Sequence, residues 1–454
     1  MRPLPRVRST LRTVLVTATT VATAAVVLSA PAQASTSAAD GDHQVTPGDF
    51  TGYGFDQCVT PTQSKMNSWM EHSPFAAVGI YTSGYSRACR DQPNLTRKWV
   101  SKQLANNWKL LPITLGPQAS CQPRFPRYGN DATISPKSKN NYAKARRQAR
   151  HTAKEAVTAA QNLGIGAGST LWYDLEGFDL GNTACRESAL RFLHAWTNKI
   201  HQLHYVSGVY SSAGSGIKML DDARINRPGK FALPDAIWLA RWDGVANTST
   251  SYISEYGWQP NKRVKQYLGG HNETWGGVTI NIDSNYMSLG KGSTMPRAGR
   301  SCGNVNINIP RFKEITTKNA ADRVTAIRVL QCQLKTRGYY KAKINGKYDA
   351  TTLAATNAFQ REHGVKARSQ WRVRHWVMLT SAGGQRTVKR GFTGRVMRRL
   401  QRSLTAATGR KVPATGVFDA KTEAAAKSWQ GRVGLRQSGV INGAAWAKLN
   451  DGQY

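Results

Sequence analysis

The last third of the chain contains an internal repeat, in which the second copy follows the first by seventy residues without a gap. The repeated positions are core-type residues and turn glycines, so each copy is predicted to form one small folded unit. Each unit is predicted to contain a helix, a Gly-rich loop, a second helix capped by Asp349 or Asp419, a Gly turn and a short final helix. The matched pairs are Leu330-Gln331 with Leu400-Gln401, Leu334 with Leu404, Gly346 with Gly416, Tyr348-Asp349 with Phe418-Asp419, Thr352 with Thr422, Phe359-Gln360 with Trp429-Gln430, Gly364 with Gly434, Trp376 with Trp446 and Leu379 with Leu449.

Each copy carries a G-x-[YF]-D-x-x-T segment and a late Trp-x-x-Leu. In these motifs the repeat resembles the peptidoglycan-binding domain type 1, a three-helix module of secreted bacterial cell-wall proteins. The resemblance covers nearly the whole repeat and implies that peptidoglycan is the partner. The first copy departs from the pattern after His363, where the stretch from Val365 to His375 is unusually basic.

The first 34 residues have the pattern of a secretory signal peptide. Several arginines precede an apolar, threonine-rich stretch from Thr13 to Leu28, and Ala32-Gln33-Ala34 offers an A-x-A cleavage site. The alternative is a membrane anchor, but the apolar run is shorter than the roughly 20 residues that a spanning helix needs. The absence of an adjacent arginine pair favours the general secretion route over the twin-arginine route. A secreted, extracellular or wall-associated protein without a later membrane span is therefore predicted.

Positive charge dominates the chain, with a formal net charge of +37. The part from Cys302 to Tyr454 holds 29 Lys and Arg against 7 Asp and Glu, a balance of +22. Such a field attracts polyanions in a salt-dependent way, so anionic wall polymers are expected partners beside peptidoglycan. Nucleic acid is the rival partner, but no helix-turn-helix, RNA-recognition or zinc-finger pattern accompanies the charge. We therefore expect no nucleic-acid partner.

The six cysteines are an even number in an exported chain, which predicts disulfides. Cys302 and Cys332 flank the start of the first repeat and are predicted to pair. The other four cysteines allow three connectivities, among which the sequence does not choose. They are Cys58, Cys89, Cys121 and Cys185. Since the chain has no C-x-x-C motif, neither a metal nor another cofactor is predicted.

Eight β-rich runs alternate with helical stretches between Gly52 and Leu289. Eight strands with helices in about 240 residues predict an α/β fold, a (β/α)₈ TIM-type barrel, with a doubly wound open sheet as the alternative. The cluster from Gly164 to Gly168 precedes its strand, so it is interpreted as a turn and not as a dinucleotide loop. The predicted strands are 52–57, 76–81, 110–115, 169–176, 205–210, 236–242, 263–267 and 278–283.

Acidic residues gather where these strands end. Trp172, Asp174 and Glu176 lie two residues apart on the fourth strand, so their side chains are predicted to share one face. Two carboxylates at such a rim are what acid/base cleavage of a glycosidic bond requires. Asp56 ends the first strand and Asp283 the predicted eighth, and these strands are neighbours in a closed barrel.

Two further groups of side chains have competing interpretations. The histidines at positions 194, 201 and 204 have helical spacing, but they flank a buried stripe and are predicted to be solvated helix residues, not metal ligands. Trp238 and Trp242 fit sugar stacking and barrel-core packing about equally well.

The strand-end motifs taken together resemble family-25 glycoside hydrolases, the lysozyme-type muramidases. They are closer still to a glycoside-hydrolase-like domain family of actinobacterial secreted proteins. The resemblance spans Phe50 to Leu289, and Gln57-Cys58 departs from it. The motifs are Gly54-Phe55-Asp56, Asp174-Leu175-Glu176, Trp238 to Trp242, Lys265-Gln266-Tyr267 and Ile282-Asp283.

This resemblance implies that Glu176 is the catalytic acid and Asp174 its supporting carboxylate. Asp56 and Asp283 would be the other two acidic residues of the site. The predicted substrate-binding residues are Trp172, Tyr210, Trp242 and Gln266.

The predicted protein is a secreted glycan hydrolase of the cell wall, held on peptidoglycan by its repeats. The alternatives are a non-catalytic wall-binding protein with a degenerate barrel, or a hydrolase of another extracellular polysaccharide. The predicted layout is a signal peptide at 1–34, a linker at 35–49, the barrel at 50–290, a second linker at 291–319, and the repeats at 320–384 and 385–454.

Overall fold

The computed structural model describes residues 44–123, 130–297, 299 and 301–454. The predicted signal peptide and most of the first linker lie outside these residues. Within them, no helix combines the length and the apolar character that crossing a membrane requires.

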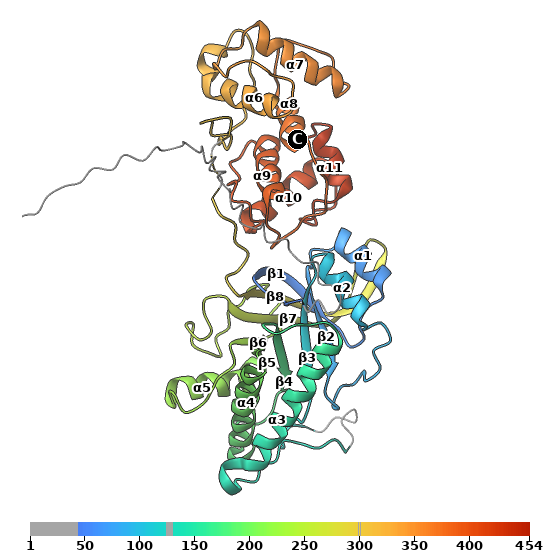
Figure 1. Ribbon diagram of the computed structural model, residues 1–454, viewed down its shortest axis with the longest axis vertical. Helices are drawn as coiled ribbons and strands as arrows, with labels where there is room; N and C mark the ends of the chain where they lie inside the picture. Colours follow the sequence, from blue (N-terminus) through green and yellow to red (C-terminus); the bar gives the residue numbers. More distant parts are fainter. Residues whose placement is uncertain (1–43, 124–129, 298, 300) are drawn as a thin grey trace, which may run out of the picture. The chain divides into compact units, whose positions relative to one another are not determined.

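Eight strands form a closed barrel in chain order, as predicted (Figure 1). The strands from β1 to β7 run parallel to one another. The final strand does not, because β8 is antiparallel to both β7 and β1. The barrel thus departs in its last strand from the all-parallel arrangement that is typical of a (β/α)₈ barrel. The strands are β1 (Phe50–Asp56), β2 (Ala77–Ser83), β3 (Lys109–Thr114), β4 (Thr170–Asp174), β5 (Val206–Ser212), β6 (Ala236–Ala240), β7 (Lys262–Trp275) and β8 (Val278–Leu289).

The reversal of β8 has a local cause in the sequence. Gly276 and Gly277 both have positive φ, at 58° and 75°, a conformation that glycine adopts without steric cost. They allow a two-residue turn that joins β7 directly to β8 as a hairpin. The hairpin continues past the barrel sheet and contacts the first helix, where the Trp69 indole N–H donates to the Val278 carbonyl at 3.0 Å.

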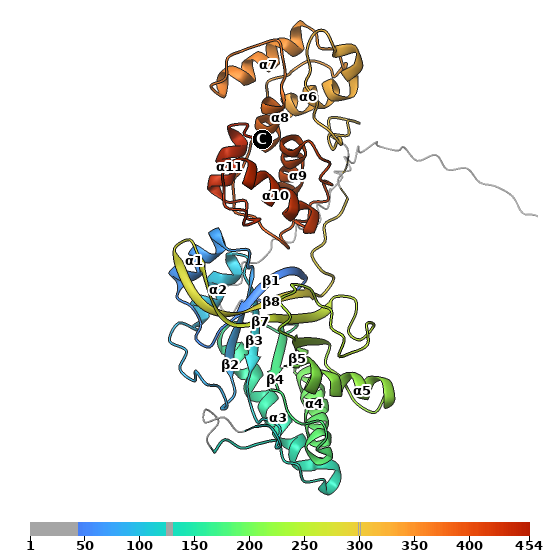
Figure 2. The same cartoon turned by 180° about the vertical axis from the view of Figure 1, so that it is seen from behind.

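Helices follow each of the first five strands. Figure 1 and the reverse view in Figure 2 show α3 and α4 side by side along the barrel. The segment 241–261, which is described throughout, connects β6 to β7 without a helix. The helices are α1 (Gln63–His72), α2 (Arg97–Ala105), α3 (Lys139–Asn162), α4 (Thr183–Gln202) and α5 (Lys218–Asn226).

Apolar side chains form two layers around the strands. Leu171 and Tyr173 of β4 belong to the cluster that packs the strands against the helices, whereas Trp172 belongs to the barrel interior. The Trp172 ring lies against Gly208 of β5, where an added Cβ would approach a ring carbon to 2.4 Å. The alternation along β4 therefore directs Trp172 and Asp174 inward, as predicted.

Three disulfides occur in the described chain. Cys302 and Cys332 are paired, as predicted. The connectivity that the sequence left open is Cys58 with Cys89 and Cys121 with Cys185.

The two repeats each fold into three helices, as predicted, and their apolar side chains form one common cluster. Asp349 accepts from the Thr352 backbone N–H at 2.9 Å and Asp419 from that of Thr422 at 2.8 Å, which confirms both predicted helix caps. The helices are α6 (Val324–Thr336), α7 (Ala350–Glu362) and α8 (Val373–Ser381) in the first repeat, and α9 (Arg395–Thr408), α10 (Ala420–Arg432) and α11 (Gly443–Asn450) in the second.

The second repeat contacts the barrel through the extended segment that precedes α9. The fully buried Lys389 ammonium donates to the carbonyls of Trp69, Ser73 and Phe75 at 3.3, 2.6 and 3.0 Å. These carbonyls lie at the end of α1 and just beyond it, where a cation also complements the helix dipole. Burial lowers the pKa of Lys389 well below its ordinary value.

Candidate active site

The end of β4 presents two carboxyl groups at the rim where the parallel strands finish. Asp174 is the last residue of the strand and is 2% exposed. The Tyr81 hydroxyl donates to the Asp174 Oδ2 atom at 3.3 Å. Burial, and then the charge of Asp174, raise the pKa of Tyr81 well above its ordinary value, so Tyr81 stays a hydroxyl donor. Asp174 is thus held inside the barrel mouth by a tyrosine of β2.

Glu176 lies two residues beyond β4, in a turn that Gln118 fixes. The buried Gln118 amide donates to the Asp174 carbonyl at 2.9 Å, and its oxygen accepts from the Glu176 backbone N–H at 2.9 Å. One side chain therefore holds the backbone on both sides of Leu175. Glu176 itself is partly exposed and lines an open cavity of about 400 Å³.

Asp56 and Asp283 form a second carboxyl pair at the same rim. They are register partners of the antiparallel strands β1 and β8. Burial, followed by the negative charge of Asp283, raises the pKa of Asp56 well above its ordinary value. The pKa of Asp283 is also raised, chiefly by burial, while the hydrogen bond from Asp56 lowers it. Both pKa values are therefore raised, so the pair favours keeping a proton at this rim.

The position of Asp283 differs from the predicted one. It was expected to end the eighth strand, but β8 continues to Leu289 and Asp283 lies near its middle. It still reaches the rim because β8 enters the barrel there, in the direction opposite to the other strands.

Gln266 connects the Asp56 pair to the cavity beside Glu176. Its oxygen accepts from the Tyr210 hydroxyl at 3.0 Å and from the Trp242 indole N–H at 2.9 Å. Its amide donates to the Asp56 Oδ2 atom at 3.2 Å, and the Asn285 amide donates to the same atom at 2.7 Å. These contacts run from the exposed Trp242 to the buried Asp56 through one amide.

The predicted substrate-binding residues occupy different depths. Trp242 is 66% exposed and lines the 400 Å³ cavity together with Tyr210. Gln266 is 2% exposed and is engaged within the protein, so its position favours a supporting role over a direct sugar contact. Trp172 has no exposed surface and packs edge-on against Trp238, with ring centres 5.6 Å apart. Its position does not support the predicted sugar contact.

The structure also separates the two tryptophans that the sequence left undecided. Trp238 lies in the barrel interior and donates to the Asn285 oxygen at 2.8 Å. Trp242 lies just beyond β6, with its ring against Gly269, where an added Cβ would meet the indole at 2.7 Å. Trp238 is thus a core residue, and the exposed Trp242 ring is available to a ligand.

Several residues of the site had not been anticipated. Tyr81 ends a predicted strand and could have been found from that position, whereas Gln118 and Asn285 carried no motif. A smaller cavity of about 150 Å³ adjoins the Asp56 pair and is lined by Tyr81, Arg87 and the Cys58–Cys89 disulfide. No group of three or more His, Cys, Asp or Glu side chains arranged to hold a metal occurs in the described ranges.

Comparisons with known families define the class of the chain. Residues 67–287 match the family model of the Rv2525c-like, glycoside hydrolase-like domain. Residues 323–367 and 393–449 match the model of a peptidoglycan binding domain. The chain therefore combines an Rv2525c-like glycoside hydrolase-like domain with peptidoglycan-binding type 1 domains. The match in the first repeat ends at residue 367, near the predicted departure after His363.

Several solved structures match part of the chain at low sequence identity. The Tat-secreted protein Rv2525c of Mycobacterium tuberculosis is 13% identical, with 53% of this chain and 97% of that chain covered at a TM-score of 0.33. The spore cortex lytic enzyme SleM of Clostridium perfringens is 12% identical, with 58% and 81% covered at 0.36. The modular autolysin LytC of Streptococcus pneumoniae is 14% identical, with 52% and 46% covered at 0.32. A comparison with curated protein sequences finds no match.

Proposed function

We propose that the chain is a secreted glycan hydrolase of the bacterial cell wall, with muramidase-like chemistry. The two C-terminal repeats hold it on peptidoglycan, and their basic surface adds attraction to anionic wall polymers. Tethering raises the effective concentration of the barrel on insoluble substrate even when each repeat binds weakly. The proposed location is outside the cell or on the wall.

The position of Glu176 carries this proposal. Glu176 is partly exposed at the wall of a 400 Å³ cavity, while Asp174 lies buried two residues before it. A glycosidase needs one carboxyl group that reaches the leaving oxygen and another that stabilises positive charge on the sugar. The exposed aromatic ring of Trp242 supplies a face for a sugar in the same cavity.

In the proposed mechanism Glu176 donates its proton to the glycosidic oxygen as the bond breaks. Asp174 stabilises the positive charge that develops on the sugar ring. Water then adds to the anomeric carbon and gives up a proton, which restores the acid form of Glu176. Acid/base assistance of this kind contributes typically about 10²–10⁴-fold. Gln118 holds the backbone of both residues, so it acts as a positioning residue.

The experiment compares the wild-type chain with Glu176→Gln on purified sacculi, and new reducing ends are measured. Glu176→Gln keeps the size of the side chain and removes the acid, so most cleavage should be lost while folding is kept. Glu255→Gln is the matched control, because Glu255 is exposed and does not line the cavity. Equal rates for wild type and Glu176→Gln would refute the assignment of Glu176.

A non-catalytic wall-binding protein is the second candidate. The observation that favours it is the depth of the other acids, since Asp56 is 3% exposed and Asp174 is 2% exposed. In that case the wild-type chain would bind sacculi and release no reducing ends from them or from other extracellular glycans.

A further inference from the structure

A third cavity, of about 300 Å³, lies between the opposite end of the barrel and the second repeat. The first residues of β1 and β3 line it on the barrel side. The segment that precedes α9 lines it on the side of the repeat. None of its lining residues lines either of the two cavities at the candidate active site.

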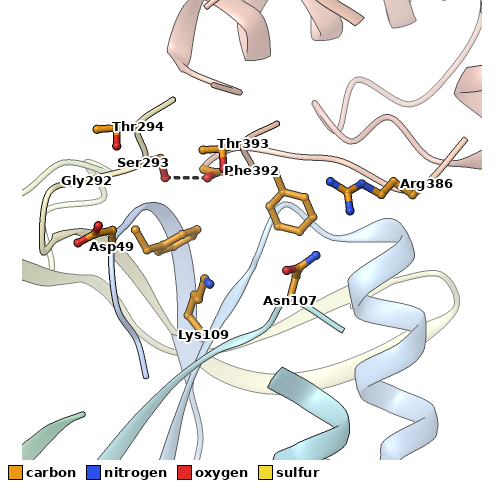
Figure 3. A pocket seen from close by; sticks show the side chains of 11 residues that line it. Asp49, Asn107, Lys109, Gly292, Ser293, Thr294, Arg386, Phe392 and Thr393 are labelled. Carbon is orange, nitrogen blue, oxygen red and sulfur yellow. Dashed lines mark hydrogen bonds between the residues drawn. The ribbon is translucent and has the colours of Figure 1, made fainter. Parts of the chain in front are cut away.

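Two cations face this cavity, one from each domain. Lys109 is the first residue of β3, and Arg386 belongs to the second repeat. Figure 3 shows both side chains extending toward the space beside Asn107. Within the described part of the chain, neither the Lys109 ammonium nor the Arg386 guanidinium has a hydrogen bond or an ion pair. Burial lowers the pKa of Lys109, and the charge of Asp49 partly offsets that effect.

Two of the other polar lining side chains, Asp49 and Ser293, are already engaged in hydrogen bonds. The Asp49 Oδ1 atom accepts from the Lys291 backbone N–H at 2.7 Å, and Figure 3 shows its carboxylate pointing away from Lys109. The Ser293 hydroxyl donates to the Gly391 carbonyl at 2.6 Å, which joins the two domains at the cavity edge. The Asn107 amide has no hydrogen bond to another described residue, and its backbone has a positive φ of 70°.

We propose that this cavity binds a phosphate group. An ammonium and a guanidinium without intramolecular partners suit an oxyanion that accepts hydrogen bonds from both of them. Guanidinium groups bind phosphate oxygens in a bidentate manner. A bound phosphate would be contacted by Lys109 of the barrel and Arg386 of the repeat, so it would also link the two domains. Its source is either free phosphate or a polyol phosphate chain of the wall, and both present negatively charged phosphate oxygens to the cavity.

The test is a titration of phosphate into the chain without its predicted signal peptide. Binding is measured by calorimetry, and sodium chloride keeps the ionic strength constant. Lys109→Gln with Arg386→Gln should weaken phosphate binding about tenfold or more, because both charge-assisted contacts are removed. The matched control is Lys98→Gln with Arg432→Gln, which removes the same two charges from exposed sites of the same two domains. The control pair should change the affinity less than about twofold, since it alters only the long-range field.

Two further variants keep the proposal testable if the double variant folds poorly. Arg386→Gln changes an exposed side chain and should weaken phosphate binding alone. Asp49→Asn keeps the acceptor for Lys291 and removes the Asp49 carboxylate from the lining, so it should strengthen phosphate binding. An opposite response to these two changes is expected only of an anion site in this cavity.

The outcomes separate the possible explanations. The polymer is identified as the source if poly(glycerol phosphate) binds at least tenfold more tightly per phosphate than inorganic phosphate does. The Arg386→Gln variant must then lose that gain in affinity. Equal affinity per phosphate identifies free phosphate. The proposal is overturned if phosphate does not bind, if the control pair loses as much affinity as the cavity pair, or if acetate competes as well as phosphate does.

Discussion

Asp56 and Asp283 are register partners across β1 and β8, and the pKa of each carboxyl group is raised above its ordinary value. The pairing depends on the antiparallel direction of β8, which carries the middle of that strand to the rim where β1 ends. Burial of Asp56 and then the nearby charge of Asp283 raise the pKa of Asp56, so protonation of this group is favoured in the folded protein.

This pair predicts a particular dependence of stability on pH. Since the pKa of Asp56 is raised in the folded protein, the folded state binds more protons than the unfolded state above the ordinary Asp pKa of about 4. The free energy of unfolding contributed by this group therefore falls as the pH rises from about 4 through the raised pKa. Asp56→Asn resembles the protonated side chain and escapes this loss.

We therefore expect the stability of Asp56→Asn relative to wild type to rise with pH, by at most about 1.4 kcal/mol per pH unit. Urea unfolding between pH 4.5 and 8 measures the difference. Asp91→Asn, at an exposed position, is the control and should show little change. A difference between Asp56→Asn and wild type that is constant with pH would contradict the raised pKa of Asp56.

A second prediction concerns the buried lysine between the repeat and the barrel. Lys389→Met removes the donor to the carbonyls of Trp69, Ser73 and Phe75 and leaves them without that partner. Unpaired buried polar groups cost about 1–3 kcal/mol, so the free energy of unfolding should fall by about that amount. Lys411→Met changes an exposed lysine of the same repeat and should cost less than about 0.5 kcal/mol. Similar losses in both variants would show that the contact does not stabilise the protein.

A third prediction tests whether Gln118 positions the proposed acid. Gln118→Leu should lower kcat on sacculi by about 10–100-fold, since small displacements of a catalytic group cost rates of that order. KM should change little, because the residue does not line the cavity. Gln103→Leu is the control, as it also removes a buried amide, which donates to Gln63 on α1 at 2.7 Å. If both variants lower kcat equally, the role of Gln118 is structural.

The sequence was sufficient for features that depend on local periodicity. Alternation along β4 predicted the inward Asp174, and the repeated Asp349 and Asp419 predicted their helix caps. The reversal of β8 was missed, although Gly276-Gly277 between two β-rich runs was a local indication of a hairpin. Gln118 could not have been found, because its hydrogen bonds join residues that are 56 and 58 positions apart in the chain. The full burial of Trp172 likewise depends on a residue of another strand, because its ring packs against Gly208 of β5.

The last prediction concerns the contribution of charge to wall binding. The +22 balance from Cys302 to Tyr454 should make binding to sacculi weaken as salt rises, because exposed charges are screened over about 10 Å at 0.1 M salt. Co-sedimentation of the Glu176→Gln chain from about 0.05 to 0.5 M sodium chloride measures this without degrading the wall. Walls stripped of anionic polymers should bind less of the chain than intact walls do at low salt. At high salt the two kinds of wall should bind equal amounts, because the packing of the repeats against peptidoglycan remains. A bound fraction that is constant across this range would mean that the basic residues contribute nothing to attachment.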